Sequence, residues 1–311
     1  MPDTRALSIV IPVFNAEASL PELWDRLCTV MDGLKLEFEA IFVDDGSRDG
    51  SWNALQTLAG SDPRCKAMRL MRNQGQHNAL ICGIRAARYP TSLTMDDDLQ
   101  HPPEEIPKLL AAFSEGFDVV YGTFSEQQHG FFRILASRLT KLALQKTMGI
   151  GIATSVSAFR VFRTDLRRAF ENYNGPLPNL DVMLSWGTTR FGSVSVGHQP
   201  RKAGGSGYTL GKLIVHALNM VTGYTVLPLQ FASLLGFVFT FFGLGLLSFT
   251  IFRYIIQGTP VQGFPFLASI ICIFSGAQLF CLGIIGEYFA RLYLKLMDKP
   301  MFTVADRLNI D

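Results

Sequence analysis

The sequence has few charged residues, and they are unevenly distributed. Asp, Glu, Lys and Arg make up 17% of its 311 positions, against 48% hydrophobic residues, a low charged share for a purely soluble enzyme. None of these four residue types occurs between Lys212 and Arg253, or between Arg253 and Glu287. Each interval exceeds the roughly 20 apolar residues that a helix needs to cross a bilayer core of about 30 Å. A chain that is soluble throughout is therefore disfavoured.

The two uncharged intervals predict membrane-spanning helices at about 229–252 and 266–286. The residues between them contain Gly and Pro, as a turn outside the hydrocarbon would. The alternative is a pair of buried core helices in a large soluble protein. Such helices usually run about 8 to 20 residues and keep a polar stripe, whereas residues 234–252 are apolar all round.

The N-terminus lacks the basic region and long apolar run of a signal peptide, so none is expected. Basic residues lie outside both predicted spans: Arg201, Lys202, Lys212, Arg291, Lys295 and Lys299. The loop between the spans holds only Arg253, at its edge. By the positive-inside rule both chain ends are expected in the cytoplasm. The prediction is a cytoplasmic domain at 1–211, a membrane domain at 212–290 and a cytoplasmic tail at 291–311.

Cysteines are few and show no C-x-x-C pairing, which disfavours a disulfide framework or a zinc-type site. The five positions are Cys28, Cys65, Cys82, Cys272 and Cys281, and two of them lie in the second predicted span. They are expected to be reduced and structural. The formal net charge of +2 carries little information about partners, and nothing indicates nucleic acid.

Residues 7–122 alternate between strand and helix patterns. Strands are expected at 7–13, 38–45, 66–71, 91–95 and 117–122, and helices at 19–34, 51–60, 75–89 and 102–116. This alternation predicts an α/β domain with a mainly parallel sheet and helices on both faces. Ligands of such sheets bind at the carboxyl ends of the strands. No G-x-G-x-x-G follows the first strand, so a dinucleotide oxidoreductase is disfavoured.

Two acidic clusters follow predicted strands. Asp44 and Asp45 end the second strand and precede Gly46 and Ser47, a string that commonly forms an Asx turn. A second acidic cluster is expected at the same edge of the sheet, which makes a binding role an equal alternative.

The second cluster is Asp96, Asp97 and Asp98, after the fourth strand. In an extended chain Asp96 and Asp98 point the same way, Gln100 follows two residues later, and Asp97 points away. Two carboxylates and an amide oxygen form an open site suited to Mg²⁺ or Mn²⁺. The alternative is a solvated loop that caps the next helix, but the glutamates at 104–105 already serve that helix N-terminus.

Several ordered segments together carry a resemblance to a known family. They are SIVIPVFNAEASLPEL at 8–23, VDDGSRDGS at 43–51, RNQGQHNAL at 72–80, DDDLQHPPEEIPKLL at 96–110 and the charge-poor C-terminal pair. The chain resembles the family-two glycosyltransferases of the GT-A fold, and among them the membrane-anchored polyprenyl-phosphate glycosyltransferases. These include dolichyl-phosphate mannose synthases, bactoprenol glucosyltransferases and undecaprenyl-phosphate 4-deoxy-4-formamido-L-arabinose transferases. The GQH and HPPEEIP segments resemble the last group most.

The resemblance implies an inverting, metal-dependent transfer of a sugar from a nucleoside-diphosphate sugar, with UDP expected, to undecaprenyl phosphate. The reaction is expected at the cytoplasmic face of a bacterial inner membrane. Nucleotide-sugar binding is implied for Pro12, Phe14, Glu17, Asp44, Asp45, Arg72 and Asp97. Mg²⁺ or Mn²⁺ binding is implied for Asp96, Asp98 and Gln100. A divalent ion stabilises the negative charge that develops on the departing diphosphate.

Arg160 and Arg201 lie, by the same resemblance, where basic side chains meet phosphates, which a guanidinium can bind through two hydrogen bonds. A surface ion pair is the alternative for each. Asp181 lies where other family-two enzymes have a carboxylate base, although it could instead orient a basic side chain or cap a helix. A lipid phosphate, with a second pKa of about 6, is largely dianionic at neutral pH and needs no base. Together with Asp96 and Asp98, Arg160 and Asp181 are the catalytic candidates.

Two segments are expected to act near the membrane. Residues 131–148 predict a basic amphipathic helix, which either lies in the membrane interface or packs on the sheet. Residues 204–212 form a loop rich in Gly and hydroxyl groups. The residues expected to receive the lipid phosphate are Arg201, Ser206, Tyr208 and Lys212. Small residues in 236–245 are compatible with a homo-oligomer through the membrane helices.

One segment departs from the family pattern. Residues 154–160 read TSVSAFR, with Ser155 and Ala158 where several relatives have carboxylates. Either the donor sugar differs, or that carboxylate is not needed, or activity is weak. Two other functions stay open: a transferase acting on a sugar hydroxyl in polysaccharide synthesis, which usually needs more spans and a base, and a sugar-nucleotide-binding membrane module without turnover.

Overall fold

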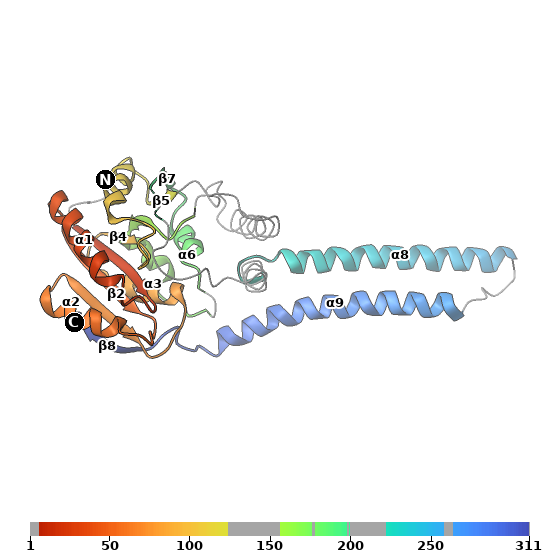
Figure 1. Ribbon diagram of the computed structural model, residues 1–311. Helices are drawn as coiled ribbons and strands as arrows, with labels where there is room; N and C mark the ends of the chain where they lie inside the picture. Colours follow the sequence, from red (N-terminus) through yellow and green to blue (C-terminus); the bar gives the residue numbers. More distant parts are fainter. Residues whose placement is uncertain are drawn as a thin grey trace. The chain divides into compact units, whose positions relative to one another are not determined.

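The computed structural model describes residues 6–123, 156–175, 178–197, 199, 222–257 and 264–310. The chain divides into two units (Figure 1). The first comprises Met1–Leu213 together with Asp298–Asp311, and the second comprises Ile214–Met297. The end of the chain therefore belongs to the same unit as its beginning. Each unit is described by itself below.

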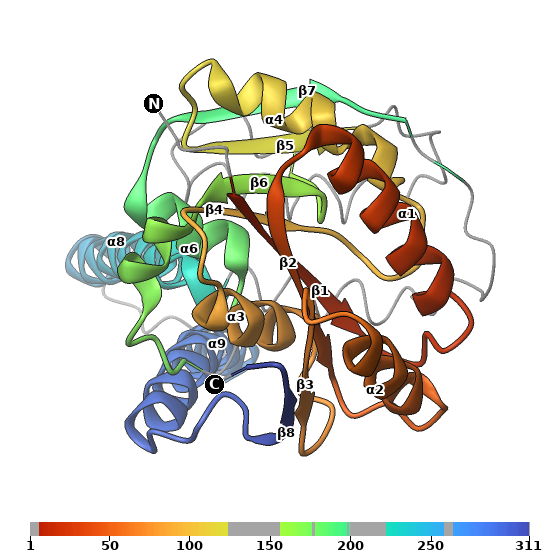
Figure 2. The same ribbon diagram turned by 90° about the vertical axis from the view of Figure 1, so that its left-hand side faces the viewer.

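A sheet of eight strands in the described residues forms the centre of the first unit, in the order β7-β5-β6-β4-β1-β2-β3-β8 (Figure 2). The strands are β1 (Ala6–Val13), β2 (Glu37–Asp44), β3 (Cys65–Leu70), β4 (Thr91–Thr94), β5 (Val119–Thr123), β6 (Arg160–Arg163), β7 (Phe191–Ser195) and β8 (Val304–Leu308). Strands β1 to β4 pair in parallel, as do β5 and β7. Strand β6 runs antiparallel between β4 and β5, and β8 runs antiparallel to β3. The predicted α/β domain with a mainly parallel sheet is confirmed.

Helices cover both faces of this sheet. They are α1 (Leu20–Leu34), α2 (Ser51–Ser61), α3 (Gln76–Ala86), the 3-10 turn η1 (Pro103–Glu105) leading into α4 (Ile106–Ser114), η3 (Thr164–Phe170) and α6 (Leu180–Gly187). Figure 2 shows α1 and α2 on one side of β1 and β2 and α3 on the other. Because side chains alternate along a strand, β1 buries Ile9 and Ile11 in the core shared with α1, α2 and α4, and turns Val10 toward α3.

The packing of α1 and α3 follows from their residue spacing. Helix α1 buries Leu20, Leu23, Trp24, Leu27 and Met31, which share one face at intervals of three and four residues. Each fully buried side chain of this kind contributes about 1.5 to 3 kcal/mol. Helix α3 lies close to β1 because Gly83 has no side chain, and a Cβ there would lie 2.4 Å from a methyl carbon of Val10.

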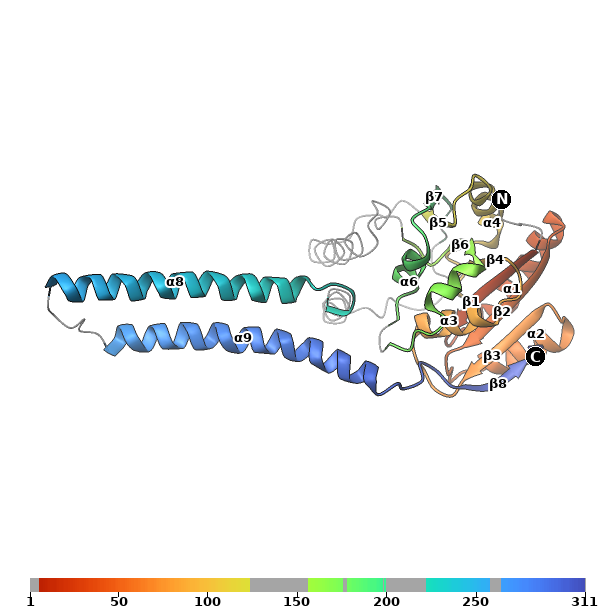
Figure 3. The ribbon, with the colours of Figure 1, turned by 180° about the vertical axis from the view of Figure 1, so that it is seen from behind.

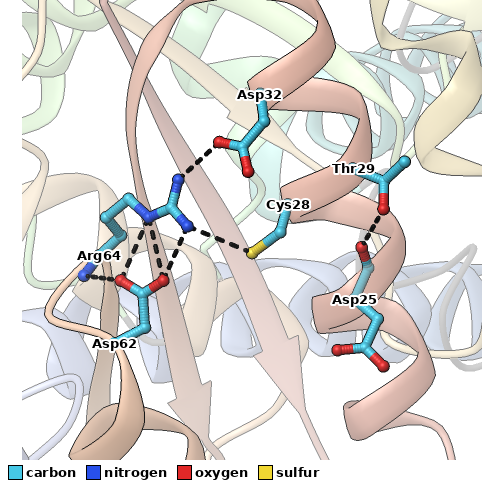
Figure 4. Close-up of polar contacts among 6 residues, drawn as sticks. All are labelled: Asp25, Cys28, Thr29, Asp32, Asp62 and Arg64. Carbon is cyan, nitrogen blue, oxygen red and sulfur yellow. Dashed lines mark hydrogen bonds and ion pairs between the residues drawn. The ribbon is translucent and has the colours of Figure 1, made fainter.

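Arg64 links the end of α2 to α1 at the edge opposite the carboxyl ends of the strands (Figure 4). Its guanidinium donates to both carboxylate oxygens of Asp62 and lies 2.7 Å from Asp32 Oδ1. The same group lies 3.8 Å from Cys28 Sγ and 4.8 Å from the Phe38 ring centre. Burial raises the pKa of the Cys28 thiol to about 11, against the lowering effect of Arg64. This cysteine is structural, as expected.

Strands β6, β7 and β8 were not expected from the sequence. Strand β8 comes from the part of the chain that was expected to be a cytoplasmic tail. Four further contacts hold this segment in the first unit. Met71 N donates to Thr303 O at 2.9 Å, and Asn309 Nδ2 donates to Ala59 O and Cys65 O at 2.7 and 2.9 Å. The Arg85 guanidinium lies 5.6 Å from the Phe302 ring centre. The tail therefore completes the sheet of the first unit.

The second unit contains the long helices α8 (Leu227–Gln257) and α9 (Phe264–Leu296), seen side by side in Figures 1 and 3. The two helices contact each other through Phe239 and Phe274, whose ring centres are 5.5 Å apart. Tyr288 Oη of α9 donates to the carbonyl of Thr225, just before α8, at 2.7 Å. Segments Leu227–Ile256 and Ile273–Leu296 are long and apolar enough to cross a membrane, and 0% of the most apolar stretch in either is buried. The core-helix alternative does not fit such exposure. Helix α9 runs about ten residues beyond the expected 266–286.

Candidate active site

Three segments far apart in the sequence meet at the carboxyl edge of the sheet. Strand β1 pairs in parallel with β2 on one side and β4 on the other, with Val13 opposite Asp44 and Val10 opposite Thr94. The loops that follow these strands therefore emerge at one edge. They carry both acidic clusters that the sequence indicated, so the expected meeting of the clusters at this edge is confirmed.

A cleft of about 230 Å³, here called the acidic cleft, lies at this edge. It is lined by Pro12, Val13, Phe14, Asp45, Asn73, Gly75, Gln76, Asp96, Asp97 and Asp98. Six of these are predicted site residues from three separate motifs. Gln100 lines neither this cleft nor its neighbour: its backbone N donates to Asp98 Oδ1 at 3.1 Å and its carbonyl accepts from Gln199 N at 3.0 Å.

The three adjacent aspartates all line the acidic cleft, each with its own partner. Asp96 Oδ1 accepts from Gln76 Nε2 at 2.6 Å, and Asp97 Oδ2 accepts from Phe14 N at 3.1 Å. The expectation that Asp97 points away is wrong. It assumed an extended chain, whereas the backbone turns at 97–98 and Leu99 has a φ of 61°.

Electrostatics distinguish the middle aspartate. Burial raises the pKa of Asp97 to about 7; the hydrogen bond from Phe14 N lowers it, and the charges of Asp96 and Asp98 raise it further. A cation bound in the cleft would lower this pKa.

The residues of the acidic cleft fit a hard divalent ion with open coordination positions. Asp96 and Asp98 supply two carboxylates, and no group of three or more His, Cys, Asp or Glu side chains suited to a metal occurs among the residues that the structure describes. Mg²⁺ is typically bound by one or two carboxylates plus substrate phosphates and water. The Gln76 amide, which the sequence analysis did not single out, orients Asp96 through a hydrogen bond and lines the acidic cleft, whereas Gln100 does not line it.

A larger cleft of about 590 Å³ adjoins the acidic cleft and shares Phe14 and Asn73 with it. We call it the arginine cleft. It is lined by Phe14, Asn15, Gly46, Ser47, Arg48, Arg69, Leu70, Met71, Arg72, Asn73, Ala305 and Asp306. Its volume is typical of small-molecule sites. Of the predicted residues, Phe14 and Arg72 lie here, beside two further arginines that the sequence analysis did not select.

The two carboxylates of the first acidic cluster have different roles. Asp44 is fully buried and lines neither cleft; its Oδ1 accepts from Ser47 N at 2.9 Å and its Oδ2 lies 3.4 Å from Arg69 Nε. This is the Asx-turn alternative, so direct binding by Asp44 is not supported. Asp45 lines the acidic cleft and accepts from Gln74 N and Gly75 N at 2.7 and 2.8 Å.

Glu17 also lies outside both clefts. Its Oε2 accepts from Gly50 N at 2.9 Å, and its backbone N donates to Asp49 Oδ2 at 3.2 Å. Glu17 therefore joins the loop after β1 to the start of α2. The expected nucleotide contact of Glu17 stays a prediction.

Arg160 and Asp181 form a buried ion pair, and Arg160 also senses the charge of Asp96. Arg160 is 2% exposed; its Nη1 pairs with Asp181 Oδ1, and its Nε donates to Thr94 Oγ1 at 2.9 Å. Tyr121 Oη also donates to Asp181 Oδ1, at 3.0 Å. Burial opposes the cation, but Asp181 raises the pKa of Arg160 above its ordinary value. Helix α6 is capped by Asn179, whose Oδ1 accepts from Val182 N at 3.1 Å. Asp181 thus orients a basic side chain, one of the three roles considered for it.

The remaining predictions lie outside the described residues. These are the amphipathic helix at 131–148, Ser155, and the proposed phosphate-binding residues Arg201, Ser206, Tyr208 and Lys212. Ala158, the other departure from the family pattern, is described, and its carbonyl accepts from Thr94 Oγ1 at 2.8 Å.

Comparison with known proteins supports the family and the fold. Residues 8–170 match the glycosyl transferase family 2 domain. The chain is 34% identical to an undecaprenyl-phosphate 4-deoxy-4-formamido-L-arabinose transferase of Shewanella sediminis, over 97% of this chain and 92% of the relative. It is 36% identical to a transferase of the same name from Pseudomonas fluorescens, over 96% and 89%.

A solved structure has a similar fold at low sequence identity. It is a glucosyl-3-phosphoglycerate synthase of Mycobacterium tuberculosis in complex with Mn²⁺, UDP-glucose and phosphoglyceric acid, with a TM-score of 0.52 and 18% identity over 70% of this chain and 78% of that one. This likeness concerns the fold alone. With the domain match, the full-length relatives and the clefts at the carboxyl edge of the sheet, the chain belongs to glycosyl transferase family 2 and has the GT-A fold.

Proposed function

We propose that this protein transfers a sugar from a UDP-sugar to undecaprenyl phosphate, with inversion at C1 and with Mg²⁺ or Mn²⁺ as cofactor. The observation that carries the proposal is the acidic cleft, which presents Asp96, Asp97 and Asp98 beside a cleft lined by three arginines. A metal-bound diphosphate needs carboxylates for the ion and donors for the nucleotide. The names of the full-length relatives support the acceptor.

In this proposal Asp96 and Asp98 hold the divalent ion against the donor diphosphate. The ion stabilises charge on the leaving nucleoside diphosphate. Gln76 positions Asp96 through the 2.6 Å hydrogen bond. Asp45, fixed by two backbone N–H groups, is available to the nucleotide, together with Pro12 and Phe14. The role of Gln100 as a ligand is not supported by its position.

No general base is needed for a phosphate acceptor, because its dianion attacks C1 directly. The environment of Asp181 supports this mechanism. Its carboxylate is buried, paired with Arg160 and hydrogen-bonded by Tyr121, and it lines neither cleft, which favours a positioning role over that of a base. Arg160 is committed to the same pair, and we assign both residues to positioning the end of β4.

The second unit supports a membrane location. The exposed apolar helices α8 and α9 suit an inner-membrane protein, and the flanking basic residues favour a cytoplasmic site and cytoplasmic chain ends. Arg201, Ser206, Tyr208 and Lys212 remain our candidates for binding the lipid phosphate.

The test uses the full chain purified in detergent. It is incubated with undecaprenyl phosphate, Mn²⁺ or Mg²⁺ and a panel of UDP- and GDP-sugars, and glycolipid is detected by mass spectrometry. With a UDP-sugar as donor, we expect a glycolipid whose anomeric configuration is inverted relative to the donor. We expect no product in the presence of EDTA. Absence of product with every donor would refute the proposal. Metal-dependent UDP binding without product would instead indicate a non-catalytic binding module, and transfer only to a sugar hydroxyl would indicate polysaccharide synthesis.

Variants in the same assay separate the three aspartates. We expect Asp96→Asn and Asp98→Asn to reduce kcat by at least about 100-fold, as loss of charge stabilisation does, and Asp97→Asn to be the mildest of the three. A matched control is Asp165→Asn, whose side chain is 76% exposed and pairs with the equally exposed Arg168. A ranking in which Asp97→Asn is the most damaging would contradict the assignment of the metal ligands.

A further inference from the structure

Strand β8 forms part of the wall of the arginine cleft. Ala305 and Asp306 line this cleft together with residues from the loops after β1, β2 and β3. In the sequence these two residues follow the second apolar helix, far from every motif that indicated the nucleotide site. The cleft at the carboxyl edge of β2 and β3 is therefore incomplete without the end of the chain.

The position of Asp306 is well defined by pairing with β3. Its Cα partner is Arg69, and directly opposed residues of an antiparallel pair project from the same face of the sheet. Arg69 is fixed in turn, because its guanidinium lies 5.7 Å from the Trp52 ring centre and 3.4 Å from Asp44 Oδ2. Asp306 itself is exposed in the cleft.

Asp306 is the only carboxylate among the described residues that line the arginine cleft. The other polar side chains that line the cleft are the arginines at 48, 69 and 72, which only donate, and the neutral side chains of Asn15, Ser47 and Asn73, which both donate and accept. Asp44, which the family resemblance implied for nucleotide-sugar binding, is buried and paired with Arg69. An N–H group of a ligand in this cleft thus meets one anionic acceptor, and it comes from β8.

The hydrogen-bonding edge of uracil matches this arrangement. Uracil presents one donor, N3–H, between the two carbonyl acceptors O2 and O4. A single carboxylate accepts from N3–H, while guanidinium and amide groups donate to the carbonyls. Ribose offers only hydroxyl groups, which a carboxylate also accepts, so the two contacts need separate tests.

We propose that Asp306 is a specificity-determining residue that accepts a hydrogen bond from N3–H of the uracil of the donor nucleotide. The inference rests on the proposed UDP-sugar donor and deepens it, because it names the contact that reads the base. The strand after the second membrane helix then forms part of the donor site.

The test measures binding to the full-length, detergent-solubilised protein in the presence of Mg²⁺, using UDP and N3-methyl-UDP. We expect the wild type to bind UDP at least about tenfold more tightly than the methylated nucleotide, as a hydrogen bond to a charged group allows. Asp306→Ala is expected to weaken UDP binding about tenfold and to leave the affinity for N3-methyl-UDP nearly unchanged, which removes the discrimination. Asp306→Asn keeps the shape of the side chain, and we expect an intermediate effect.

The neighbouring residue provides a matched control. Arg307 is opposite Met68 in the register, so it projects from the other face of β8; Arg307→Ala should bind both nucleotides as the wild type does. Equal weakening of both nucleotides by Asp306→Ala would overturn the proposal in favour of a general effect on β8. A discrimination that persists in Asp306→Ala would also overturn it. A third outcome would overturn it as well: the wild type binds 2′-deoxy-UDP more weakly than UDP, and Asp306→Ala binds the two equally. The contact of Asp306 would then be to ribose.

These results are distinguishable from failure of the proposed function. If the wild type makes glycolipid from a UDP-sugar but binds UDP and N3-methyl-UDP equally, the inference fails alone. If the wild type binds no UDP, the proposed donor is wrong and the inference is overturned with it.

Discussion

Replacing Asp181 by Asn would separate a positioning role from a catalytic one. The change keeps the shape of the side chain and an acceptor for Tyr121 Oη, but it leaves the Arg160 cation without its counter-charge. Arg160 is 2% exposed and Asp181 is 5% exposed. Of its described side-chain contacts, the cation would keep the neutral hydrogen bond to Thr94 Oγ1 at 2.9 Å.

The expected cost follows from this burial. Removing one partner of a buried ion pair typically costs about 3 to 5 kcal/mol, because the other charge stays buried and unpaired. Since the introduced amide would still accept one hydrogen bond, we expect a cost at the lower end of this range, about 3 kcal/mol. A domain of 150 to 250 residues loses about 2 to 4 °C in Tm per kcal/mol, which gives a decrease of about 6 to 12 °C.

The assay combines thermal unfolding of the detergent-purified protein with the glycolipid assay at a temperature well below Tm. We expect Asp181→Asn to have a lower Tm than the wild type and a higher kcat than Asp98→Asn. The Tm of Asp98→Asn should stay close to that of the wild type. The double variant Arg160→Met with Asp181→Leu removes both charges, so its stability should exceed that of Asp181→Asn. The exposed pair of Asp165 and Arg168, at 76% and 77% side-chain exposure, is the control, since loss of such a pair changes stability by less than about 1 kcal/mol.

Two outcomes would refute this reasoning. An unchanged Tm with a loss of kcat equal to that of Asp98→Asn would identify Asp181 as a base. A double variant less stable than Asp181→Asn would show that the pair is not held by the mutual neutralisation of two buried charges.

Two further predictions concern the loop after β2 and helix α1. Gly46→Ala should cost about 2 to 4 kcal/mol and weaken UDP binding, because φ is +71° and a Cβ would lie 2.8 Å from the backbone of Arg72 and Asn73. Thermal unfolding checks this, with Gly60→Ala as a control that should stabilise helix α2, since nothing lies within 4 Å of its added Cβ. The Cys28 thiol, with its pKa raised from 9.0 to about 11, favours the neutral form in the folded state. At pH 8 only about one thiol in a thousand is a thiolate, so alkylation by iodoacetamide should be slow and rise about tenfold per pH unit between pH 7 and 10. Fast labelling of the folded protein at pH 8 would contradict the buried setting of Cys28.

Local patterns in the sequence were sufficient for most of the first unit. Strands β1 to β5 and the helices between them follow from apolar periodicity, because the residues that each element buries are spaced regularly within a short stretch of sequence. The two apolar helices follow in the same way from runs without charge. Strands β6, β7 and β8 were missed although they are no shorter than β4 and β5. They lie outside the regular strand–helix alternation of residues 7–122, and they form only beside a partner strand that is distant in the sequence.

At the candidate site, the motifs predicted which clusters meet but not what each side chain does. Asp96 and Asp98 lie in the cleft as expected, whereas Gln100 does not, because the chain turns at 97–98 and the alternation of an extended strand no longer applies. Asp44 and Glu17 were predicted to bind the nucleotide, yet the carboxylate of each accepts a hydrogen bond from a backbone N–H group of the loop after β2.

The sequence by itself determined the fold family, the two candidate spans and the acidic edge of the sheet, since these depend on residues close together in the chain. Only the tertiary structure decided that Asp181 pairs with Arg160 and that Asp306 reaches the arginine cleft. Both depend on pairings between strands and helices distant in sequence. Such pairings are set by the packing of the whole unit, which no local pattern encodes.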